Sequence, residues 1–123
     1  MINIINDIEE MARIGFMKNN IEIVIRTNDS GKIPHFHFFD RNRDKDNEGC
    51  IRIDKPEYFN HSGKNLELNS SQKKELVEFL SSVHNKKRSE DTNWKFLLQM
   101  WNDNNSDVEV DERLGMPDYT LLK

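Results

Sequence analysis

The sequence predicts an α+β fold, in which a small antiparallel sheet of three to four strands carries helices packed on one face. Three short stretches are rich in isoleucine or phenylalanine, alternate in polarity and are joined by polar connections, as antiparallel strands are. Two later stretches instead repeat apolar residues every three or four positions, as amphipathic helices do. We expect the helices to cover one face of the sheet and the other face to be more polar.

The chain is expected to begin with a short helix near residues 6–13. Asn6 is placed to cap this helix, and Glu9 follows three residues later as in a capping box. Arg13 to Lys18 is compatible with either a helix end or a strand. The Asn19-Asn20 pair then predicts a tight turn, because asparagine tolerates the left-handed backbone conformation.

Three strands are predicted in the first half of the chain. Residues 21–27, IEIVIRT, are the strongest, with three isoleucines on one face. Residues 35–40, HFHFFD, follow Pro34, a residue that is tolerated where a strand begins. Residues 50–54, CIRID, form the third strand, after a charged loop.

Two helices are predicted in the second half of the chain. Ser70 or Ser71 is expected to cap the first, which extends to about residue 84 and buries Leu76, Val77, Leu80 and Val83. The second covers about residues 93–102, where the apolar stripe consists of Trp94, Leu97, Leu98 and Trp101. The apolar residues between 114 and 122 are candidates to dock the following segment on the body.

The length of 123 residues fits a single domain, residues 1–123, with a core of about 5–102 and an acidic C-terminal extension of 103–123. No apolar run approaches 18 residues, so we expect no membrane partner, and the first residues do not resemble a secretory signal. The single cysteine, Cys50, excludes an internal disulfide and a zinc site made of several cysteines. We expect a cytoplasmic protein, with Cys50 as a packed thiol rather than a nucleophile.

Charge is unevenly distributed along the chain, whose net charge is −4. Residues 35–88 carry eleven basic and nine acidic groups, whereas residues 89–123 carry three basic and eight acidic groups. This pattern argues against a protein that binds nucleic acid with its whole surface, and it leaves room for a local basic site in the middle.

The sharpest motif is Pro34-His35-Phe36-His37-Phe38. On a strand, His35 and His37 point to the same side, about 7 Å apart, while the phenylalanines point into the core. Three interpretations fit this spacing. The histidines are two metal ligands, with a third from His61, His84 or a carboxylate; or an acid–base pair that contacts phosphate; or ordinary polar residues on an exposed face.

Arg26 and Arg52 are expected on the same face as the two histidines. Two guanidinium groups beside two imidazoles suit a phosphodiester, because arginine binds phosphate with paired hydrogen bonds and histidine exchanges protons. This arrangement predicts a metal-independent ribonuclease, with His35 and His37 catalytic and Arg26 and Arg52 binding. The alternative is that the arginines form cross-strand ion pairs with Glu22 and Asp54.

The strand IEIVIRTND, the motif PHFHF, the strand CIRID and the helix ELVEFLSSVH before Asn93-Trp94 together resemble a family of very small bacterial proteins. That family is known mainly as a domain of unknown function, and the resemblance covers about residues 21–101. Its members are often encoded in pairs that look like toxin–antitoxin systems, in bacteria or phages. The resemblance implies a small α+β domain with an RNA-directed or protein-partnered role, and His35 and His37 are the positions that match its motif.

The favoured hypothesis is therefore a toxin-like domain that cleaves or binds RNA through its His-x-His strand, whether or not it is an enzyme. The alternative is a non-enzymatic module, of mobile-element origin, that binds or inhibits a cognate protein through its acidic C-terminal region. The sequence assigns no cofactor and no metal ligand, and it does not define the oligomeric state.

Overall fold

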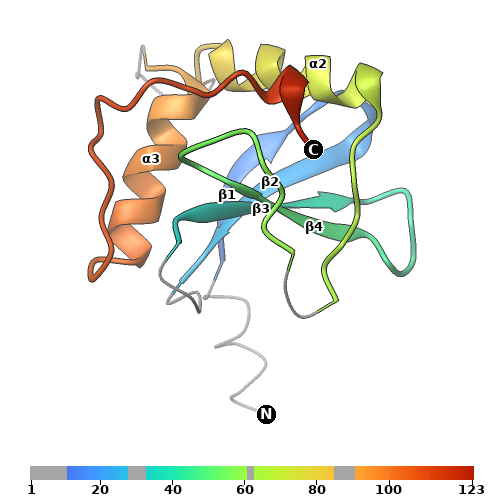
Figure 1. Ribbon diagram of the computed structural model, residues 1–123, viewed down its shortest axis with the longest axis horizontal. Coiled ribbons are helices and arrows are strands. Elements are labelled where there is room, and N and C mark those ends of the chain that lie inside the picture. Colours follow the sequence, from blue (N-terminus) through green and yellow to red (C-terminus); the bar gives the residue numbers. More distant parts are fainter. Residues whose placement is uncertain (1–10, 28–32, 61–62, 85–90) are drawn as a thin grey trace.

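The computed structural model describes residues 11–27, 33–60, 63–84 and 91–123. A four-stranded antiparallel sheet, in the order β1-β2-β3-β4, is followed in the chain by two helices, α2 and α3 (Figure 1). The strands are β1 (Met11–Phe16), β2 (Ile21–Arg26), β3 (His35–Asp40) and β4 (Glu48–Arg52). The helices are α2 (Ser70–Ser81) and α3 (Asn93–Asn104), with short 3-10 turns η1 (Lys18–Asn20) and η2 (Tyr119–Leu121). The predicted fold class is confirmed.

The prediction of a helix over residues 6–13 is wrong for its last three residues, and residues 6–10 lie outside the described part of the chain. Met11 to Arg13 begin strand β1, which pairs antiparallel with β2. Pairing with an isoleucine-rich neighbour outweighs the local helical pattern here, because most helical stability comes from tertiary packing. Asn19 and Asn20 both adopt positive φ, 64° and 62°, so the predicted asparagine turn joins the two strands.

The other elements deviate from prediction at their ends: α2 stops at Ser81 rather than near residue 84, so Val83, predicted to be buried, lies beyond the helix and is 57% exposed. Strand β4 starts two residues earlier than expected, because Glu48 and Gly49 pair with β3. Helix α2 is capped by Asn69 rather than by Ser70 or Ser71: the Asn69 side chain accepts from the backbone N–H of Gln72, whose side chain accepts from the backbone N–H of Asn69. This is a complete capping box. Helix α3 ends at Asn104 and has Thr92 as its N-cap.

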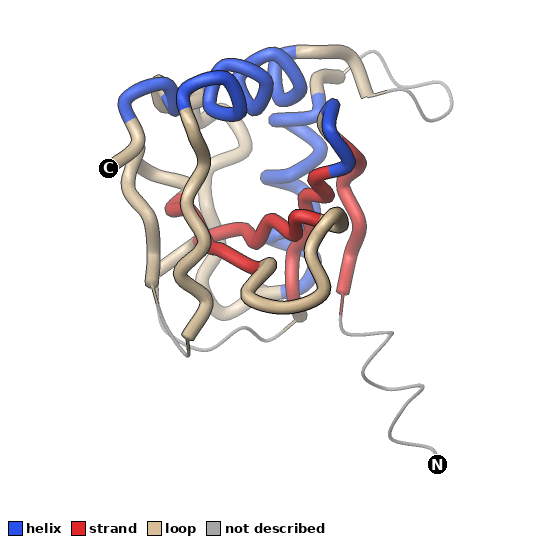
Figure 2. Tube along the Cα trace, turned by 90° about the vertical axis from the view of Figure 1, so that its right-hand side faces the viewer, coloured by secondary structure: helices blue, strands red, loops and turns tan. Residues whose placement is uncertain are grey.

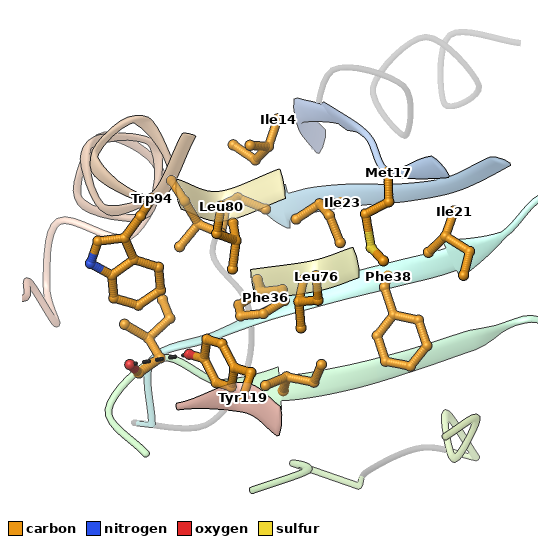
Figure 3. Packing of buried hydrophobic residues seen from close by; sticks show 14 of the residues in the cluster. Ile14, Met17, Ile21, Ile23, Phe36, Phe38, Leu76, Leu80, Trp94 and Tyr119 are labelled. Carbon is orange, nitrogen blue, oxygen red and sulfur yellow. Dashed lines mark hydrogen bonds between the residues drawn. The ribbon is translucent and has the colours of Figure 1, made fainter. Parts of the chain in front are cut away.

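One face of the sheet forms the hydrophobic core (Figure 3). Isoleucines of β2 and phenylalanines of β3 pack there against Leu76 and Leu80 of α2 and against the buried side of α3. All four members of the stripe predicted for α3 are buried, as expected: Trp94, Leu97, Leu98 and Trp101. Figure 2 shows the helices on one side of the strands.

The segment after α3 completes this core, so the predicted limit of the core at residue 102 falls too early. Tyr119 is fully buried and its hydroxyl donates to the backbone carbonyl of Arg52, while Leu122 is 3% exposed. The indole N–H groups of Trp94 and Trp101 donate to the backbone carbonyls of Leu114 and Val108. The segment thus runs from the end of α3 to α2 (Figure 1), and its backbone carbonyls are held by hydrogen bonds from the two indoles.

Within the described residues, neither helix has the length and hydrophobicity needed to cross a lipid bilayer.

Candidate functional site

The candidate site lies on the sheet face opposite the hydrophobic core. Strand β3 is paired on both sides, with His37 opposite Val24 of β2 and Cys50 of β4, and with His35 opposite Arg52. Because side chains alternate between faces along a strand, the two histidines share one face with Cys50 and Glu48. The register of the central strands therefore gathers these polar residues.

The two histidines point to the same side, as predicted, with their ring centroids 5.1 Å apart. Both are completely buried, so their interpretation as polar residues on an exposed face is wrong. The ring of His35 also lies 4.5 Å from the ring of Phe59 and 5.7 Å from that of Trp101. Phe59 belongs to the irregular segment after β4, which local sequence patterns do not place against the sheet.

A fixed acceptor orients each imidazole. Nδ1 of His35 lies 2.8 Å from the backbone carbonyl of Ile33, and Nδ1 of His37 lies 2.7 Å from the Glu48 carboxylate. A carbonyl or an ionised carboxylate only accepts hydrogen bonds, so Nδ1 carries a proton in both rings. In a neutral imidazole the second nitrogen, Nε2, then holds the lone pair.

Cys50 is the third member of the cluster, and its predicted burial is confirmed. Its Sγ lies 3.2 Å from Nδ1 and 4.0 Å from Nε2 of His37. One ligand atom from each of His35, His37 and Cys50 lies within 4.8 Å of the other two. We call these three residues the His-His-Cys cluster.

Glu48 connects the cluster to Arg26. The Arg26 guanidinium donates to the Glu48 carboxylate at 3.2 Å and lies 5.6 Å from the ring centroid of Phe39. Partial burial acts to raise the pKa of Glu48, but His37 and Arg26 outweigh it, so that the pKa lies below its ordinary value. Glu48 is therefore a carboxylate near neutral pH, shared by an imidazole and a guanidinium.

Arg52 does not join this network through any contact among the described residues. Its guanidinium donates two hydrogen bonds to Asp54, at 2.9 and 2.8 Å, so an Arg52–Asp54 ion pair exists, but it joins residues two apart in one segment rather than two strands. The predicted pairing of Arg26 with Glu22 is wrong. Glu22 is buried and accepts from Arg13 at 2.8 Å and from Arg41 at 2.6 Å instead.

Of the other proposed metal ligands, His61 lies outside the described residues. His84 is placed between α2 and α3, where Nδ1 lies 2.7 Å from Oδ1 of Asn93. Sequence reasoning missed Glu48 and Cys50 as members of the site. The signal that identifies them is positional: an antiparallel β3–β4 hairpin in the observed register puts Cys50 opposite His37 and Glu48 two positions further along the same face, opposite Phe39.

The cluster lacks the geometry of a cysteine protease-like relay. In such a relay the two imidazole nitrogens face different partners, the nucleophile and the carboxylate. Here the Glu48 carboxylate and the Cys50 sulfur both approach Nδ1 of His37, and the sulfur is fully buried. The arrangement of these residues is instead that of a set of ligands with an oriented second layer.

Comparison of the chain with protein-family models, with curated proteins and with solved structures finds no match. The resemblance to the small bacterial family accordingly stays a prediction from the sequence.

Proposed function

We propose that this protein is a metal-binding domain, in which His35, His37 and Cys50 hold a transition-metal ion of the zinc or copper(I) type. The observation that carries the proposal is the convergence of three ligand atoms within 4.8 Å from completely buried side chains. The sequence alone allows metal ligation by His35 and His37 as one of three interpretations, but it favours a metal-independent site and treats Cys50 as a packed thiol.

The types of ligand select the class of metal. Thiolate and imidazole bind zinc and copper(I), whereas magnesium and calcium prefer oxygen ligands. The cluster offers one sulfur and two imidazole nitrogens on paired strands, a rigid support. We therefore expect Zn²⁺ or Cu⁺ to bind and Mg²⁺ or Ca²⁺ not to bind.

The orientation of the imidazoles supports metal binding through Nε2. Metal-binding histidines usually donate their other ring N–H to a carbonyl or a carboxylate, which fixes the ring. Ile33 and Glu48 supply these two acceptors. Zinc bonds of about 2.3 Å to sulfur and about 2.0 Å to nitrogen put tetrahedral ligands about 3.5 Å apart. The distance of 4.0 Å from Sγ to Nε2 of His37 needs only a small closure.

Metal content and Co²⁺ spectroscopy test the proposal. Purified protein, loaded with Co²⁺ as a probe for the zinc site, is expected to bind one ion and show a thiolate-to-cobalt charge-transfer band. Cys50→Ser should remove the band, and His35→Gln should weaken Co²⁺ binding at least tenfold. His84→Phe, which alters a histidine outside the cluster, should leave both unchanged.

Two results would overturn the proposal: wild-type protein that binds no Zn²⁺, Cu⁺ or Co²⁺, and a charge-transfer band that persists in Cys50→Ser. Circular dichroism of each variant shows whether it is folded. If Cys50→Ser does not fold, metal titration of the wild-type protein alone decides, because the band reports sulfur ligation directly.

The toxin-like, RNA-directed function remains a second proposal, and the described contacts put conditions on it. Arg26 is engaged with Glu48 and Arg52 with Asp54, so phosphate would have to compete with these carboxylates. Expression of the chain is expected to arrest growth, with relief by His35→Ala or His37→Ala. Absence of arrest, together with intact RNA after incubation with purified protein, would reject this function.

One observation favours the non-enzymatic alternative, the binding of a basic protein. The segment after α3 is anchored through the indoles of Trp94 and Trp101, yet its acidic side chains are exposed. These are Asp107, Glu109, Asp111, Glu112 and Asp118. Neutralising Asp107, Glu109 and Glu112 together should abolish capture of a cognate partner from the native host, whereas neutralising Glu78, which is exposed on α2, should not. Equal capture by both variants would reject this surface.

A further inference from the structure

A separate cavity of about 410 Å³ lies between β1 and the C-terminal end of α2. Four apolar side chains line it, those of Ile14, Phe16, Phe79 and Val83, together with the polar side chains of Ser82, His84 and Asn93. Phe16 and Val83 are 50% and 57% exposed, unusually high for large apolar residues at a cavity rim. The volume falls in the range of cavities that hold small molecules.

The floor of the cavity depends on Gly15. This residue has φ of +154°, and a Cβ added to it would lie 3.0 Å from Cζ of Phe79. The backbone of β1 therefore touches the Phe79 ring. Any other residue type at position 15 would carry a Cβ and so displace this ring or the backbone.

His84 is held rigidly beside this cavity. Its backbone N–H donates to the carbonyl of Asp91 at 2.8 Å, and the next pair, Val83 and Thr92, forms a β-bridge. The imidazole stacks on the ring of Phe96, with centroids 4.0 Å apart and planes at 21°. The side chain is 8% exposed, so both its place and the plane of its ring are set by packing.

The hydrogen bonds of Asn93 fix the tautomer of His84. Nδ2 of Asn93 donates to the carbonyl of Phe79 at 2.8 Å, so its Oδ1 faces the imidazole as an acceptor. Nδ1 of His84 must then be the protonated nitrogen. Nε2 is left as a hydrogen-bond acceptor, and it bonds to no residue in the described part of the chain.

We propose that this cavity binds a small, flat, neutral molecule that donates one hydrogen bond, of the phenol or indole class. The apolar side chains of the lining, which include the rings of Phe16 and Phe79, favour a flat apolar body. The Nε2 acceptor of His84 selects a donor group. Among the described residues, the side chains that line the cavity include no Lys, Arg, Asp or Glu, so they offer no counter-ion to a charged ligand.

Two matched ligands test the proposal: phenol donates a hydrogen bond, and toluene has nearly the same shape without a donor. Titration of each into ¹⁵N-labelled protein is followed by NMR, with the ¹⁵N resonance of His84 Nε2 as the specific readout. Phenol is expected to bind at least fivefold more tightly than toluene and to shift the Nε2 resonance upfield, as an accepted hydrogen bond does.

His84→Phe keeps the ring stack and removes the acceptor, so phenol and toluene should bind this variant equally. Phe16→Ala should weaken both ligands, and Lys18→Ala, an exposed neighbour, should weaken neither. Equal binding of phenol and toluene to the wild-type protein, or no perturbation of cavity residues by either, would overturn the proposal. This comparison uses the wild-type chain and so stands even if His84→Phe fails to fold.

Discussion

Both faces of the sheet contain completely buried side chains, but these side chains are of opposite chemistry. Ile23 and Phe38, cross-strand partners on the core face, are completely buried among aliphatic and aromatic side chains. Val24 and His37, the next pair along, are also completely buried, but there the neighbours include Glu48 and Cys50. Burial alone therefore does not distinguish a core from a site; the distinction lies in what the buried groups bond to.

The difference has an energetic basis. A large apolar side chain gains about 1.5–3 kcal/mol from burial without any directional partner. A buried polar group costs free energy unless it is hydrogen-bonded. On the polar face Ile33, Glu48 and Arg26 supply such partners in a defined geometry. We expect the core face to tolerate changes of shape poorly, and the polar face to tolerate loss of a partner poorly.

The largest effect is expected from Phe36→Ala on the core face. Phe36 is completely buried and meets Tyr119 edge-on, with ring centroids 5.8 Å apart. Loss of the ring leaves a cavity and should lower the free energy of unfolding by about 3–5 kcal/mol. Urea denaturation measures this value; a loss below about 1 kcal/mol would mean that the Phe36 site is not a packed core position.

Metal removal should have the next largest effect, and it acts on the polar face alone. If metal is present at 100 times its dissociation constant, binding adds about 2.7 kcal/mol to the stability of the folded state. Chelation should then lower the melting temperature of wild-type protein by about 10 °C. Cys50→Ser should show little response to chelator. If chelator does not change the melting temperature of wild-type protein, the cluster is a set of packed polar residues and not a metal site.

Glu48→Gln should lower the free energy of unfolding by about 1–3 kcal/mol at pH 7, because a carboxylate shared by His37 and Arg26 is lost. The pKa of Glu48 is lowered in the folded state, so its contribution is complete above the pKa of the unfolded chain. The contribution disappears as the pH falls through the folded pKa. Denaturation between pH 7 and pH 3 should show a steeper loss of stability for wild-type protein than for Glu48→Gln. Parallel curves would contradict the assigned role.

The smallest effect is expected for Asn69→Ala, which removes the cap of a helix on the core face. Its side chain accepts a hydrogen bond from one backbone N–H of α2, that of Gln72, and the Gln72 side chain accepts one from the backbone N–H of Asn69. Loss of a cap costs about 1 kcal/mol. Thermal denaturation should report a fall of a few degrees, and Ser71→Ala, beside the cap, should report almost none. Equal losses would mean that the cap lies elsewhere.

Local patterns were sufficient for most of the fold and for only half of the site. The period of 2 over residues 35–40 and the spacing of Trp94 and Trp101 depend on neighbours in the chain, so the sequence predicts them well. Strand β1 has no such pattern and exists because β2 is beside it. The same holds for the site: His35 and His37 are adjacent in one motif, whereas Cys50 and Glu48 join them through β3–β4 register. The sequence predicts the correct face for Arg26. Its ion-pair partner lies on β4, two strands away from β2 in the sheet, and cannot be identified without the strand order.

The segment after α3 sets an order for biosynthesis. A polypeptide is made from its N-terminus, and domains fold as units. Strands β1 to β4 and helices α2 and α3 are complete by residue 104, but the hydrophobic cluster still lacks Tyr119 and Leu122. The Tyr119 hydroxyl must reach the end of β4, 67 residues earlier in the chain. The hydrophobic core of the newly made protein is therefore closed only after residue 122 has left the ribosome.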